Sequence, residues 1–241
     1  MIQNHKHTNH GFTVVELMIA MAFISLLLLA IILTVMQVGA IYNKGVTMKS
    51  VNQAGRIVVA DMKRAIGESG VDIIYKPHER GNDAGNPVYD AGRLCTGVYS
   101  YIWNVGTFIG SDSNDPNFQV NKYQGTDDDR KKPLRLVKVK DSNSHYCQGD
   151  GTDDIQKSDA VELLSESELA VQDFHIERMT NNLASGSALY SIQITISNAE
   201  TEAIDTVDNT CKPPSEEPAL QNFCAVNEFA FTARTGNGGG Q

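Results

Sequence analysis

The sequence lacks the short motifs by which many hydrolases and nucleotide-binding enzymes are recognised. It contains no G-x-S-x-G, which would expose a nucleophilic serine, no H-E-x-x-H zinc pair and no glycine-rich phosphate loop. Three histidines, His78, His145 and His175, are scattered and belong to no catalytic motif. We therefore predict that the protein is not an enzyme and uses no cofactor.

Basic residues are scarce, with 20 lysines and arginines against 29 aspartates and glutamates, so that the net charge is −9 at pH 7. Such an acidic chain repels nucleic-acid phosphates, and we expect no nucleic-acid partner. Hydrophobic residues are an ordinary 41% of the 241 residues. The length therefore suits one anchor and one globular domain of about 150–170 residues.

Charge is absent from the twenty residues Leu17 to Met36. At about 1.5 Å per helical residue this run is about 30 Å long, the thickness of the hydrocarbon core of a bilayer. It therefore predicts a membrane-inserted helix. Lys6 precedes the run and no lysine or arginine follows until Lys44, which favours a cytoplasmic N-terminus.

Glu16 directly precedes this run, at the edge of the predicted apolar helix. A carboxylate there is costly, and an ionisable residue in a membrane segment indicates a function. In a bundle of such helices the buried carboxylate needs a cationic partner. The N-terminal amine of a neighbouring subunit would neutralise Glu16 and set the axial stagger between helices. The alternative is a chance acid that snorkels to the interface.

The segment Gly11 to Ala20, G-F-T-V-V-E-L-M-I-A, resembles the N-terminus of type IV prepilins and of type II secretion pseudopilins. Their pattern is a glycine at the cleavage point, then phenylalanine, a glutamate five residues into the mature chain, and an apolar helix. The resemblance implies that a prepilin peptidase cuts between Gly11 and Phe12 and that the Phe12 amine is then methylated. It also implies that the mature chain waits in the bacterial inner membrane before it enters a filament.

Beyond Met36, apolar residues recur in steps of three, four and seven, which marks one face of an amphipathic helix. They are Ile41, Met48, Val51, Ala54, Val58, Met62 and Ala65, with Lys44, Lys49, Asn52, Gln53, Arg56, Lys63 and Arg64 on the polar side. We expect one helix from about Thr13 to Ile66, about 80 Å long, whose second half packs on a sheet. Its internal glycines permit either bending during assembly or close packing; they are Gly39, Gly45 and Gly55.

The rest of the chain predicts strands. Aromatic and β-branched residues favour strands at 98–105, 134–140, 160–167, 169–179, 189–196 and 229–234. The clearest is 189–196, where Tyr190, Ile192, Ile194 and Ile196 alternate with polar residues, as in a half-buried antiparallel strand. Turn-forming residues crowd 81–92 and 110–117, so we interpret residues 71–133 as mostly connections, with Trp103 in the core. The fold class predicted is α+β.

We divide the chain into five parts. They are a leader at 1–11, a transmembrane and filament-core helix at 12–36, its amphipathic half at 37–67, a β-rich periplasmic domain at 68–235 and a flexible tail at 236–241. The resemblance implies that the long helix and the antiparallel sheet together form a type IV pilin fold.

The four cysteines, which allow three pairings, are Cys95, Cys147, Cys211 and Cys224. All would face the oxidising periplasm, and we favour Cys95–Cys147 and Cys211–Cys224, each worth about 3–4 kcal/mol. Zinc held by His145 and Cys147 is the alternative, but there is no C-x-x-C and oxidation would compete. Acidic loops at 112–115, 127–129 and 150–154 suggest calcium without the spacing of a known calcium loop. We predict no metal.

The region from the strand at 169–179 to Arg234-Thr235-Gly236-Asn237 resembles PilW-type minor pilins and the J-type minor pseudopilins, although their terminal Arg-Asn pair is interrupted here. The resemblance implies a minor type IV pilin near the filament tip that helps to initiate or cap assembly. Its partners would be other minor and major pilins, the prepilin peptidase, the inner-membrane assembly platform and, before assembly, the lipid bilayer. The alternatives are a type II secretion pseudopilin and a tip-displayed adhesin or ligand-binding module using loop 106–133.

Overall fold

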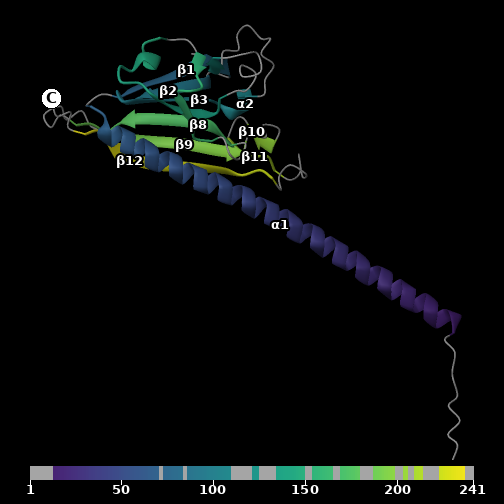
Figure 1. Cartoon of the computed structure of the whole chain (residues 1–241). Helices are drawn as coiled ribbons and strands as arrows, with labels where there is room; N and C mark the ends of the chain where they lie inside the picture. The colour runs from purple at the N-terminus through teal and green to yellow at the C-terminus, as the bar shows by residue number, and fades with distance from the viewer. Residues whose placement is uncertain are drawn as a thin grey trace, which may run out of the picture. The chain divides into compact units, whose positions relative to one another are not determined.

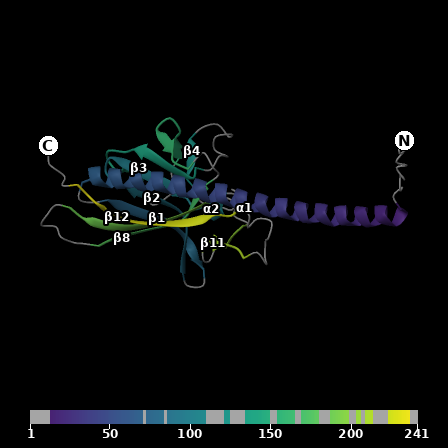
Figure 2. The ribbon, with the colours of Figure 1, turned by 90° about the horizontal axis from the view of Figure 1, so that it is seen from below.

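A computed structural model describes residues 13–70, 73–83, 86–109, 121–124, 134–149, 154–164, 169–179, 187–198, 203–205, 209–213 and 223–236 (Figures 1 and 2). The chain divides into two compact units, Met1–Asn43 and Lys44–Gln241.

A single helix, α1, runs from Val14 to Glu68 and confirms the predicted long helix to within two residues at each end. In the first unit nearly every described side chain is exposed, as expected of a segment that is apolar on all sides. In the second unit one stripe of the helix is buried. It consists of Val51, Gly55, Val58, Met62, Ala65 and Ile66. Each member after Val51 follows an earlier one by three or four residues, as a packed helix face requires.

The second unit contains two antiparallel sheets. The five-stranded sheet has the order β1-β2-β3-β5-β7, and the three-stranded sheet has the order β12-β9-β8. The strands of the first are β1 (Ile74–Asp83), β2 (Asn86–Cys95), β3 (Tyr99–Asn104), β5 (Leu136–Lys140) and β7 (Ala160–Glu162). Those of the second are β8 (Leu169–Arg178), β9 (Leu189–Asn198) and β12 (Val226–Arg234). A parallel bridge between Val105 and Val171 connects the two sheets.

Shorter elements lie around these sheets. A parallel pair is formed by β4 (Lys122–Gln124) and β6 (Asp154–Gln156), and an antiparallel pair by β10 (Ile204–Asp205) and β11 (Thr210–Cys211). Two one-turn helices, α2 (Gly106–Ile109) and η1 (His145–Cys147), complete the described elements. The coarse α+β prediction, a long N-terminal helix with antiparallel sheets, is confirmed.

The buried stripe of α1 and the inward faces of both sheets form one hydrophobic core. Alternation in β9 is as predicted, with Tyr190, Ile192, Ile194 and Ile196 all buried. Trp103 is only 2% exposed, and its ring centroid lies 4.4 Å from that of Phe174 in β8. The prediction that Trp103 belongs to the core is confirmed.

The interpretation of residues 71–133 as mostly connections was wrong. Residues 74–83 and 86–95 pair as the antiparallel strands β1 and β2, with register shifts around Glu79. Gly92 lies inside β2, and the indole ring of Trp103 packs directly against it. A Cβ at this position would lie 2.3 Å from Trp103 Cζ2, so only glycine leaves room for the ring. The glycine makes room for a distant side chain, whereas the sequence favoured a turn. The expected strand at 160–167 is also shorter, ending at Glu162.

The helix glycines differ in what surrounds them. A Cβ at Gly55 would lie 2.1 Å from Phe229 Cζ of β12, whereas Gly39 and Gly45 have no neighbouring atom within 4 Å. Close packing therefore explains Gly55, and the bending explanation stays open for the other two.

We predict that Gly55→Ala destabilises the protein by up to about 2 kcal/mol. Overpacking costs about 1–3 kcal/mol, and the better helix propensity of alanine offsets about 1 kcal/mol. Denaturant unfolding of the full chain in detergent would measure the change. The control is Gly45→Ala, which should stabilise by up to about 1 kcal/mol because its methyl group meets open space. Equal effects of the two substitutions would contradict the packing role of Gly55.

Candidate functional site

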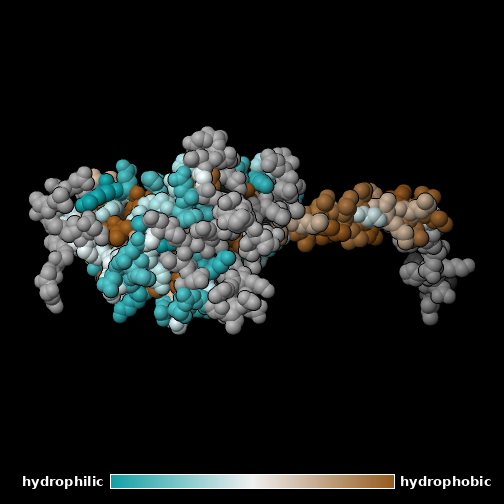
Figure 3. Space-filling view, turned by 90° about the horizontal axis from the view of Figure 1, so that it is seen from above, coloured by the Kyte–Doolittle hydropathy of each residue, from teal (hydrophilic) through white to brown (hydrophobic). Residues whose placement is uncertain are grey.

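The first unit presents a continuous apolar surface. Its part of α1 is the only stretch among the described residues long and apolar enough to cross a membrane, and none of the most apolar window is buried. Figure 3 shows the hydrophobic side chains gathered around this half of the helix. Apolar surface of this extent is not left in water by soluble proteins, so lipid or protein must cover it.

Glu16 takes part in the start of this helix. Thr13 is the residue before the first helical position, and its hydroxyl accepts a hydrogen bond from Glu16 N–H at 3.3 Å. The carboxylate Oε2 of Glu16 accepts in return from Thr13 N–H at 3.0 Å and from Thr13 Oγ1 at 2.9 Å. This is a capping box, which satisfies backbone donors that have no partner within the helix.

The cap occupies only half of the carboxylate. Oε2 accepts both bonds from Thr13, and Oε1 accepts no hydrogen bond from any residue that the structure describes. Glu16 can therefore cap its own helix through Oε2 and still accept a hydrogen bond from another chain through Oε1. The pattern T-x-x-E in the sequence is a signal for this cap, although we did not predict one there. The other two predicted processing residues, Gly11 and Phe12, lie outside the described residues.

A polar clamp that no sequence pattern predicted holds the packed half of α1 to β3 and β5. Asp61 Oδ1 lies 2.8 Å from Lys138 Nζ, and Asp61 Oδ2 accepts a hydrogen bond from Tyr101 Oη at 2.7 Å. Burial, followed by the hydrogen bond to Asp61, raises the pKa of Tyr101, which keeps the phenol a neutral donor. Lys138 Nζ also lies 4.1 Å from the ring centroid of Tyr99. The clamp fixes the helix register on the sheet.

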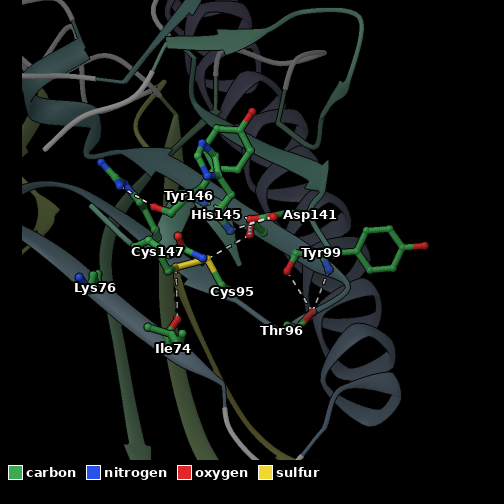
Figure 4. The surroundings of a disulfide bond; sticks show 12 residues. Ile74, Lys76, Cys95, Thr96, Tyr99, Asp141, His145, Tyr146 and Cys147 are labelled. Atoms are coloured by element: carbon green, nitrogen blue, oxygen red, sulfur yellow. Dashed lines mark hydrogen bonds between the residues drawn. A yellow bond between two sulfur atoms is a disulfide. The ribbon is translucent and has the colours of Figure 1, made fainter. Parts of the chain in front are cut away.

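Both disulfides favoured from the sequence are present. Cys95–Cys147 joins the end of β2 to η1 and is almost fully buried (Figure 4). Cys211–Cys224 closes the segment between β11 and β12. Because Cys147 is bonded to Cys95, it offers no thiolate for the zinc alternative.

Asp141 organises the turn that carries Cys147. Its carboxylate accepts hydrogen bonds from the Ser100 hydroxyl at 2.7 Å, from His145 N–H at 2.9 Å and from Tyr146 N–H at 3.1 Å. Figure 4 shows Asp141 beside His145 and Tyr146. Burial opposes ionisation, but these hydrogen bonds outweigh it and hold the pKa of Asp141 below its ordinary value.

The histidines do not converge. His78 Nδ1 lies 2.6 Å from the buried carboxylate of Asp90, His145 is exposed on η1, and His175 is exposed on β8. Among the described residues no three histidine, cysteine, aspartate or glutamate side chains form a group that could hold a metal ion. The acidic loops considered for calcium lie almost wholly outside the described part of the chain.

A groove runs between α1 and β12 within the second unit; we call it the α1–β12 groove. Its volume is about 400 Å³, in the range of about 300–1,000 Å³ typical of ligand sites. Its walls are Arg56, Val59, Ala60 and Lys63 of the helix and Glu228, Phe229, Ala230 and Phe231 of the strand. The sequence could not show this groove, because it joins residues about 170 positions apart.

Comparison with known proteins finds no relative: no family model, curated protein or solved structure matches the chain.

We predict that Asp141 makes stability depend on pH in the acidic range. Because its folded-state pKa lies below the unfolded value of about 3.9, its contribution is complete above that value and is lost as pH falls through the folded-state pKa. Unfolding of the full chain should be compared with that of Asp141→Asn from about pH 6 to about pH 3. The gap in unfolding free energy should narrow as pH falls; a gap independent of pH would contradict this role.

Proposed function

We propose that this protein is a minor subunit of a type IV pilus, located near the filament tip, where it helps to initiate or cap assembly. The observation that carries the proposal is the start of α1. Gly11 and Phe12 lie five and four residues before the capped glutamate Glu16. The helix that contains Glu16 is apolar all round in its first half and then packs by one stripe on antiparallel sheets.

A helix that is exposed and apolar in its first half and packed on a sheet in its second half suits a type IV pilin fold. In such an assembly the exposed half of α1 lies first in the inner membrane and then among the helices of the filament core. Both environments cover its apolar surface without any change in the helix. The disulfides support a domain that matures in an oxidising compartment, here the periplasm.

The proposed chemistry at Glu16 is charge pairing between subunits. Cleavage between Gly11 and Phe12 by the prepilin peptidase creates a new amine, which is methylated on Phe12. The Glu16 Oε1 atom that the cap leaves without a partner would accept a hydrogen bond from the amine of a neighbouring subunit. In an apolar core each charge needs the other, so the pair would set the axial offset between subunits.

Two alternatives share parts of this proposal. A pseudopilin of type II secretion would use the same helix, cleavage and pairing, and would differ in the apparatus it joins. A tip-displayed adhesin or ligand-binding module would use loop 106–133, of which residues 110–120 and 125–133 lie outside the described residues. The partners proposed are other minor and major pilins and the inner-membrane assembly platform.

We predict that protein from its native membrane has lost residues 1–11 and carries one added methyl group. Intact-mass spectrometry before and after reduction would measure both, and reduction should add the mass of four hydrogen atoms from the two disulfides. Gly11→Leu should block cleavage because of its bulk, whereas Gly11→Ala should be mild. A full-length, unmethylated chain would leave an ordinary membrane anchor and overturn the proposed processing.

We predict that Glu16→Gln prevents entry into filaments while cleavage continues. Glutamine preserves the capping box, but it cannot pair with an amine as a charge. Loss of one partner of a buried pair costs about 3–5 kcal/mol, so incorporation should fall by about a hundredfold or more, measured in sheared filaments by immunoblot.

The matched control is Thr13→Ala, which removes the cap hydroxyl and keeps the charge. It should cost about 1 kcal/mol of helix stability and leave incorporation nearly normal. If Glu16→Gln enters filaments at the normal level while Thr13→Ala does not, capping and not charge pairing is the role of Glu16.

A further inference from the structure

The α1–β12 groove lies beside an unpaired sheet edge. In the three-stranded sheet β12 pairs only with β9, and no described strand pairs with its other side. Its nine residues pair in one uninterrupted register, without proline and without a bulge. Natural proteins usually protect such edges with bulges, prolines or very short strands, because they attract other strands.

The hydrogen bonds of β12 identify which backbone groups face outward. Thr235 N–H donates to Ala188 C=O at 2.9 Å, and Ala225 C=O accepts from Asn198 N–H at 3.2 Å, both toward the β9 side. Successive residues of a strand alternate in the side to which their N–H and C=O groups point. Even-numbered residues from Glu228 to Arg234 therefore direct both groups toward the open edge.

The helix wall beside this edge is basic and partly apolar. Arg56 is exposed and forms no ion pair with any described residue, and Lys63 Nζ lies over the Phe231 ring at 5.5 Å from its centroid. Val59 and Ala60 lie between them, and Glu228 is the one acid of the lining. In a chain of net charge −9, this places two basic side chains next to backbone donors and acceptors that no described strand pairs.

We propose that an extended acidic segment of a second protein, different from this one, adds as a strand to the open edge of β12. Its backbone hydrogen-bonds with the outward-facing residues, as in β-strand addition, and every second side chain points toward α1. Acidic residues at those positions meet Arg56 and Lys63. A second copy of this chain is disfavoured as the partner, because pairing β12 with β12 brings together two identical basic helix walls.

Binding of a labelled peptide to the full chain in detergent micelles tests the proposal. The probe is a nine-residue peptide in which glutamate alternates with valine, followed by fluorescence anisotropy. The control peptides carry lysine in place of glutamate, or N-methyl groups that remove alternate backbone donors. We expect the acidic peptide to bind at least about tenfold more tightly than either control.

The protein variants separate backbone pairing from charge. Ala230→Pro removes one outward N–H and leaves pairing with β9 intact, because proline is tolerated where a strand N–H faces an open edge. It should weaken peptide binding about tenfold, with an unfolding midpoint close to that of the unsubstituted chain. Thr232→Val, which keeps the backbone donors, is the matched control and should bind normally. Arg56→Glu with Lys63→Glu should reverse the preference toward the lysine peptide.

Three outcomes would overturn the proposal. The first is no binding of the acidic peptide up to about 1 mM. The second is equal binding of the N-methylated peptide, which would show that the strand edge is not used. The third is a dimer of this chain, seen by analytical ultracentrifugation, that Ala230→Pro abolishes, since the occupant of the edge would then be a second copy.

Discussion

The contact between Gly55 of α1 and the ring of Phe229 in β12 sets how closely the helix approaches the sheet. Only a residue without a Cβ permits it, and the stripe that includes Val58 and Met62 is buried as a consequence. Asp61 then fixes the helix along its axis through Lys138 and Tyr101. The close contact at Gly55 and the charged contact at Asp61 together define one position of α1 on the sheet, which an apolar stripe alone would not specify.

The same approach leaves room beside β12. Because the helix touches the strand through Phe229, its flank from Arg56 to Lys63 lies next to the open edge without covering it, and the α1–β12 groove results. The three-stranded sheet packs on the hydrophobic core, and the disulfide Cys211–Cys224 ties down the chain just before β12 begins, so the edge has a rigid support. Rigid support matters for strand addition, since a preorganised edge loses little entropy when a partner pairs with it.

How much the sequence could predict depended on whether the signal was local. The span of α1 and the alternation of β9 were predictable, because hydropathy and period act over neighbouring residues. Gly92 led us to predict a turn, but it lies in a strand. Its position is a glycine because the ring of Trp103 on the next strand packs against it, and that contact is not visible in the local sequence. The clamp between Asp61 and Lys138 joins residues far apart in the chain, which no local pattern indicates. The Thr13 cap, by contrast, was predictable from T-x-x-E, because its signal spans only four residues.

The Glu16 carboxylate can cap its own helix and also take part in the proposed charge pairing. Capping would favour that pairing. In a membrane an unpaired carboxylate at the helix edge is costly, and bonds from Thr13 to Oε2 offset part of that cost before any neighbour arrives. They also restrict the side-chain torsions of Glu16, which orients Oε1. In the proposed filament the cap would thus lower the entropy lost on pairing, and the charge would supply the attraction.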